Sequence, residues 1–155
     1  MIQRIQTIYL LGAAVLMALA LVLPLATFYG QGHEFMLRGT AIADTTDKTS
    51  PILMVATPWL ATLLILAAVV PLAAIFLYKK RMVQTRLCFF EAVLLLGAQG
   101  FMAYYIIHYK AVIDAVSWKF GIATIFPAVA FVLVVLAVRA IIRDELLIKS
   151  LNRFR

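Results

Sequence analysis

Glu91 stands inside a long apolar run, where a carboxylate can carry a proton, bind a cation or pair with a base. It lies five residues after Arg86, which places it about 7–8 Å deeper along a helix. Arg139 lies four residues before Arg143 at the end of another apolar run, about 6 Å deep by the same rule. These matching depths predict an ion pair between Glu91 and Arg139 that joins two helices.

Two alternatives stay open for Glu91. A carboxylate that titrates in a proton or cation path would need further acidic groups deeper in the helices, and the other apolar runs contain none. A side chain that reaches the water without any specific partner is the other alternative. We therefore expect a structural ion pair. A titrating carboxylate and a side chain without a specific partner remain the alternatives.

Polar side chains near the same ends of the apolar runs predict an interaction rim on the cytoplasmic side. The glutamines among them are also expected to hydrogen-bond the ion pair. The rim consists of Gln3, Arg4, Gln6, Gln84, Arg86, Arg143, Asp144, Glu145 and Arg153.

Other reactive residues do not form a recognisable catalytic or metal motif. His33, Glu34, Asp44 and Asp47 share one polar segment, but their spacing is not that of a known metal site. Cys88 is expected at the opposite end of the helices from both histidines, so no nucleophile and base can meet. We expect a non-enzymatic protein without a metal or cofactor.

The composition points to a protein that lies largely in lipid. Of 155 residues, 65% are hydrophobic and only 14% are charged, which is more apolar surface than a soluble domain of this size can bury. The net charge of +7 does not indicate nucleic acid, because the basic residues flank apolar runs instead of gathering on a polar face.

Four apolar runs reach the length of about 20 residues that a helix needs to cross a bilayer. No alternating pattern of a membrane barrel is present. We predict an all-α membrane protein whose single domain, residues 1–155, is a four-helix transmembrane bundle. The expected spans are 5–29, 52–78, 87–109 and 120–142.

The basic residues predict the orientation of the chain. Ten of the fourteen Lys and Arg residues fall near the termini and in the 79–86 turn, and the other four near the opposite helix ends. Both termini are therefore expected in the cytoplasm. The 30–50 segment then forms a short extracytoplasmic loop, in which the residues on either side of Gly39 can pair as a small β-hairpin.

The last segment, 143–155, continues the fourth helix out of the apolar run as an amphipathic tail. Leu147, Leu151 and Phe154 form a narrow apolar stripe, with cationic residues around it. We expect this tail to lie against anionic headgroups of the cytoplasmic leaflet, and a helix that binds a partner protein would look similar.

Several stretches together resemble a known protein family. They are “MIQRIQTIYLL”, “KKRMVQTRLC”, “FGIATIFPAVAFVLVVLAVRAI” and “RDELLIKSLNRFR”, and the likeness covers nearly the whole chain. The sequence resembles the bacterial family of small membrane proteins known as domain of unknown function 4293. The resemblance implies a bacterial inner membrane and no particular activity.

The expected function is that of a multi-pass accessory or assembly subunit in the bacterial inner membrane. Its expected partners are the lipid bilayer and another membrane protein, or further copies of the chain, and not nucleic acid. The alternative is a small-solute or ion translocator, which could form a homo-oligomer with a pore between its subunits. Gln99 and Glu91 are the residues that come closest to lining such a pore.

Overall fold

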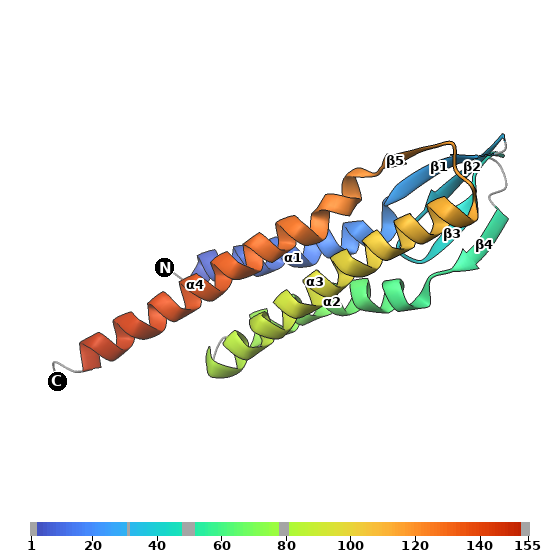
Figure 1. The fold of residues 1–155 in the computed structure, drawn as a ribbon. Coiled ribbons are helices and arrows are strands. Elements are labelled where there is room, and N and C mark those ends of the chain that lie inside the picture. The colour runs from blue at the N-terminus through green and yellow to red at the C-terminus, as the bar shows by residue number, and fades with distance from the viewer. Residues whose placement is uncertain (1–2, 31, 48–51, 78–80, 153–155) are drawn as a thin grey trace.

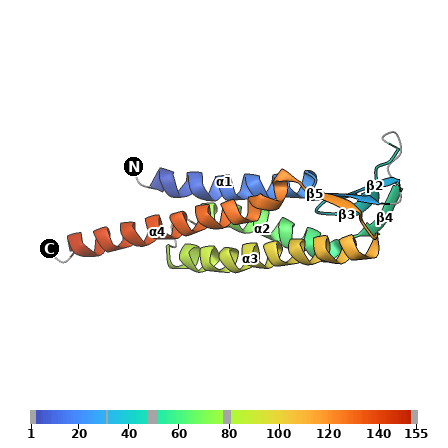
Figure 2. The same cartoon turned by 45° about the horizontal axis from the view of Figure 1, so that its top comes forward.

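The computed structural model describes residues 3–30, 32–47, 52–77 and 81–152. Within these residues, the chain forms four long helices and a five-stranded sheet at one end of them (Figure 1). The start of α1 and the end of α4 lie at the opposite end from the sheet (Figure 2). The helices are α1 (Gln3–Val22), α2 (Pro58–Phe76), α3 (Arg81–Val112) and α4 (Phe126–Asn152), and a 3₁₀ turn, η1 (Ile122–Ile125), leads into α4.

Each helix packs against two others, α1 on α2 and α4, and α3 on α2 and α4. Buried residues recur every three or four positions, as they must on one face of a helix with 3.6 residues per turn. In α1 this face contains Leu10, Ala13 and Met17, and in α4 it contains Val134 and Ala137. In the described part of the chain, four helices are long and apolar enough to cross a membrane.

Five strands form an antiparallel sheet in the order β4-β3-β2-β1-β5. The first four follow one another between α1 and α2, whereas β5 comes from the connection between α3 and α4. The sheet therefore joins two separate segments of the chain. The strands are β1 (Ala26–Gly30), β2 (His33–Leu37), β3 (Ala41–Asp44), β4 (Ile52–Ala56) and β5 (Ser117–Phe120).

One face of the sheet belongs to the core and the other is open. Phe28, Leu37 and Ile42 are almost fully buried, and the C-terminal turns of α3 run along this face (Figure 1). The buried and part-buried residues alternate along β1, as the two-residue period of a strand requires. The open face contains Thr27 and Met36, which are partners in the β1–β2 register.

The connection from β5 to α4 crosses the chain just after α1. The amide of Gly121 donates a hydrogen bond of 2.8 Å to the carbonyl of Leu25. A Cβ atom at Gly121 would overlap the carbonyl oxygen of Pro24, so only glycine fits this crossing. The crossing sets the position of β5 beside β1.

The predicted all-α fold is wrong, because the chain also forms a five-stranded sheet, and two apolar segments expected at helix ends are its strands β1 and β4. At the start of the fourth span, Phe120 ends β5 and residues 122–125 form the 3₁₀ turn. The spans 5–29 and 52–78 were expected to be helical throughout, yet α1 ends at Val22 and α2 begins at Pro58. The helix of the fourth span begins at Phe126 instead of residue 120. Proline explains these limits: Pro24 follows α1, and Pro58 and Pro127 occupy the first turns of their helices, where proline is favoured.

Two finer predictions agree with the structure. The segments on either side of Gly39 pair as the hairpin of β2 and β3, with Leu37 opposite Ile42. The fourth helix continues beyond its apolar run to Asn152. The remaining tail residues, 153–155, lie outside the described part of the chain, as do the side chains of 145–152.

Candidate functional site

The structure does not bring Glu91 and Arg139 together as the predicted ion pair. The Glu91 side chain is fully buried, and neither carboxylate oxygen has a hydrogen-bond partner among the described residues. Arg139 is exposed. Ala137 and Ile141 are buried and define the face of α4 that packs against the other helices. Arg139 lies two positions from each of them. Because successive residues of a helix are rotated by about 100°, its side chain leaves the opposite face of α4, away from Glu91.

A different polar pair joins the first and last helices. The side-chain amide of Gln6 donates a hydrogen bond of 2.8 Å to Oδ2 of Asp144, and both residues are buried. The other oxygen of Asp144 has no partner within the described residues. Two residues expected on an exposed rim thus hold α1 against α4.

The predicted cytoplasmic rim is therefore divided. Gln84 is buried on the same face of α3 as Cys88 and Glu91, so it too belongs to the packing of the helices. Arg86 and Arg143 are exposed and remain available to partners or headgroups. The side chains of Gln3, Arg4, Glu145 and Arg153 lie outside the described part of the structure.

The polar residues of the sheet form a local network. His33 Nδ1 lies 3.0 Å from Oδ2 of Asp44, and the amide of Thr46 donates to Oδ1 of the same carboxylate at 2.9 Å. Hydrogen bonds from Thr46, and then the nearby imidazole of His33, hold the pKa of Asp44 below its usual value. Among the described residues, no three His, Cys, Asp or Glu side chains are grouped as a metal site would require.

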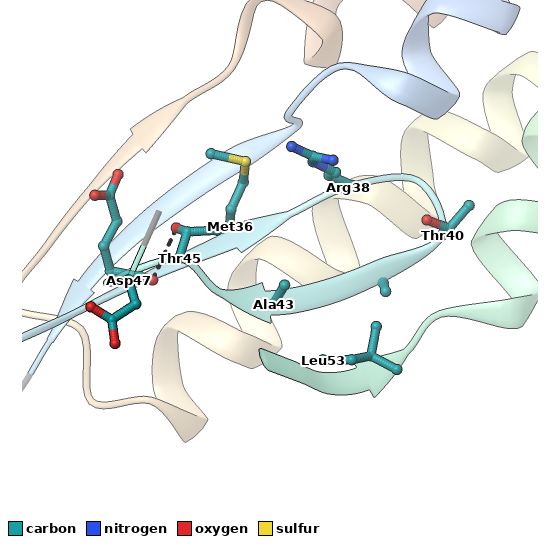
Figure 3. A pocket seen from close by; sticks show the side chains of 9 residues that line it. Met36, Arg38, Thr40, Ala43, Thr45, Asp47 and Leu53 are labelled. Atoms are coloured by element: carbon teal, nitrogen blue, oxygen red, sulfur yellow. Dashed lines mark hydrogen bonds between the residues drawn. The ribbon is translucent and has the colours of Figure 1, made fainter. Parts of the chain in front are cut away.

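The open face of the sheet contains a groove that sequence analysis missed (Figure 3). Its volume is about 480 Å³. Ala41 and Ala43 of β3 contribute small side chains to its floor, and Met36 of β2 and Leu53 of β4 stand on either side. The register explains this arrangement, because Ala43 is paired with Met36 on one side and with Leu53 on the other.

The two ends of this groove carry opposite charges. Arg38 follows the end of β2 that is nearer the helices, and Asp47 lies at the other end of the groove (Figure 3). Glu34 also lies at that other end, because it is the second residue of β2. Arg38 follows Glu34 by four positions in extended chain, a distance of about 13 Å. None of the three side chains forms an ion pair with another described residue.

The end of the groove near Arg38 is fixed to the helices. Thr57, which precedes α2, is buried, and its hydroxyl donates a hydrogen bond of 3.2 Å to the carbonyl of Gly39. A Cβ atom at Gly39 would come within 2.8 Å of a Leu64 methyl group and 3.0 Å of the Cα of Leu21. The β2–β3 turn therefore sits directly on the ends of α1 and α2.

Beside the groove, β4 forms one edge of the sheet and is exposed along its whole length. Ile52, Leu53 and Met54 are 68%, 65% and 56% exposed. An apolar edge strand presents both unpaired backbone groups and apolar side chains, and it is a ready site for pairing with another chain. The groove residues recur at every second position in 34–38 and in 41–45, which indicates two strands, but the groove itself depends on how those strands pair.

The comparisons with known proteins give a family but no activity. No protein with a curated description matches the chain. A family model matches residues 2–154, which is nearly the whole sequence. The chain therefore belongs to the family described as domain of unknown function DUF4293.

Proposed function

We propose that this protein is a non-enzymatic accessory or assembly subunit of a bacterial inner membrane, which binds another membrane protein through its sheet. The four long apolar helices support insertion in a bilayer. The excess of basic residues at the helix ends away from the sheet supports cytoplasmic termini, so the sheet stands on the extracytoplasmic side.

The observation that carries the proposal is the exposed edge of β4 next to a charged groove. The apolar side chains of β4 are exposed, which is unfavourable in water. The strand precedes α2, so these side chains lie outside the helical part of the protein. Arg38 and Glu34 have no ionic partners among the described residues, and a partner protein can supply them. The apolar strand would provide contact area and the charges would set the register.

A different protein fits this surface better than a second copy. Two copies in one membrane stand parallel, and a twofold axis along the membrane normal would bring like parts of the two grooves together. Arg38 would then face Arg38, at a cost in like-charge repulsion. A partner with an acidic group near the membrane and a basic group about 13 Å above it avoids this cost.

Site-specific photocrosslinking in living cells tests this function. A photoreactive residue replaces Met54 in β4, and the matched control carries it at Val116, an exposed apolar position between α3 and β5. We expect a discrete adduct with another membrane protein from position 54 that is absent from position 116. In addition, Arg38→Glu should weaken that adduct. Adducts only between copies of this chain, or none, would refute the proposal.

Glu91 supports a second candidate function, translocation of protons or small ions. A fully buried carboxylate without any described partner is costly in a membrane and is commonly functional. The side-chain oxygen of Gln99, two turns further along α3, is also buried and has no hydrogen-bond partner among the described residues. Ion flux into proteoliposomes that disappears with Glu91→Gln, and persists with Arg139→Gln, would favour this function over the first.

A further inference from the structure

A second hollow lies where α3 passes β5 and the start of α4. Its volume is about 550 Å³, within the range of small-molecule sites. Apolar side chains from four elements form most of its wall: they include Ile107 of α3, Trp118 and Phe120 of β5, Ile125 of η1 and Ala128 of α4. The hollow is therefore an apolar groove built by segments that are distant in sequence.

The groove opens sideways from the helices. Trp118 and Phe120 lie on the face of β5 that is continuous with the buried face of β1, because they are paired with Phe28 and Ala26. Their rings meet edge to face, with centroids 4.3 Å apart. Phe120 and Ile107 are nevertheless 63% and 70% exposed, so the groove faces the surroundings of the helices.

A cation stands at one end of this groove. The ammonium nitrogen of Lys110 lies 5.2 Å from the ring centroid of Trp118, in a cation–π contact. Lys110 forms no ion pair with any residue that the structure describes. Gln99 lines the groove eleven residues earlier in α3, which is about 16 Å along the helix. The groove thus combines one charged end with an apolar length.

We propose that this groove binds a phospholipid with an anionic headgroup, taken from the leaflet next to the sheet. Its phosphate pairs with Lys110, and one acyl chain lies along Trp118, Phe120 and Ile107. A zwitterionic headgroup brings its own cation and leaves less net charge for Lys110. This site rests on the membrane insertion proposed above, but not on the binding of a partner protein.

Fluorescence quenching tests the site, because the chain has only two tryptophans. In the Trp59→Phe variant, Trp118 is the sole emitter. The protein is reconstituted in phosphatidylcholine vesicles that contain a low fraction of phosphatidylglycerol with bromine in the upper acyl chain. A matched set contains brominated phosphatidylcholine instead. The Trp118→Phe variant keeps Trp59, which is 71% exposed at the start of α2, as the reference for ordinary boundary lipid.

We expect the brominated anionic lipid to be enriched about fivefold around Trp118, the factor that one cation near a membrane surface provides. Lys110→Gln should abolish this preference, and Trp59 should show little of it. Equal quenching of Trp118 by the two lipids, or a preference that survives Lys110→Gln, would overturn the site. If neither tryptophan is quenched, the proposed membrane insertion fails as well.

Discussion

The side-chain amide of Gln6 donates a 2.8 Å hydrogen bond to the carboxylate of Asp144, and so connects two residues that are 138 positions apart. Both residues are buried, so the bond closes the ring of helices at the end away from the sheet. A buried carboxylate is expensive unless it is hydrogen-bonded. Gln6 therefore contributes to stability mainly by partnering Asp144.

The first prediction concerns this bond. Gln6→Leu should lower the free energy of unfolding by about 1–2 kcal/mol, because it leaves Asp144 buried without its donor. Asp144→Asn should cost less, since its amide oxygen can still accept from Gln6. Thermal melting of the two variants in one detergent measures the difference. Equal losses would show that the bond itself contributes little.

The second prediction concerns Glu91. Its oxygens have no described partner, so Glu91→Gln should leave the melting temperature unchanged or raise it. Arg139→Gln should have an independent, small effect, because Arg139 is exposed. The double variant should therefore show simple additivity. A coupling of more than about 1 kcal/mol between the two substitutions would restore the ion pair.

The third prediction concerns pH. The pKa of Asp44 lies below its usual value of 3.8 because Thr46 donates hydrogen bonds to the carboxylate. The ionised form therefore stabilises the fold above that usual value, and the contribution is lost as the pH falls through the lowered pKa. The melting temperature of the protein should exceed that of Asp44→Asn near neutral pH, and the two should converge as the pH falls below the lowered pKa of Asp44. A difference that does not depend on pH would contradict this.

The fourth prediction separates two kinds of glycine. Gly121→Ala should destabilise the protein by about 3 kcal/mol or more, because the new methyl group overlaps the backbone at Pro24. Gly100→Ala is the matched control: a Cβ atom there meets nothing within 4 Å, and a helix prefers alanine by about 0.5–1 kcal/mol. Similar losses in both variants would mean that β5 does not cross the chain as described.

Hydropathy predicted the number and order of the long helices, because an apolar run of sufficient length has few other solutions in lipid. It misjudged their ends. Ile52–Ala56 is as apolar as the helix that follows it, and Ala26–Gly30 carries no charge, so composition alone cannot distinguish these short strands from helical turns. The pairing of β5 with β1 could not be predicted locally, since it depends on where distant segments meet.

The polar sites show the same division. The spacing from Arg86 gives the position of Glu91 along α3. The direction in which Arg139 points could not be predicted, because it depends on which helices α4 packs against. The hairpin around Gly39 was local and was predicted correctly. The groove between Met36 and Leu53 needed the register of three strands, which no single segment specifies.

The proposed function depends most directly on the side of the membrane that carries the sheet. Labelling with a membrane-impermeant thiol reagent tests this in a Cys88→Ala background. Leu53→Cys in β4 and Met82→Cys at the start of α3 are matched, with the native side chains 65% and 69% exposed. We predict that position 53 reacts while the inner membrane is intact, and that position 82 reacts only after it is permeabilised. The reverse pattern would place the sheet in the cytoplasm and contradict the proposed function.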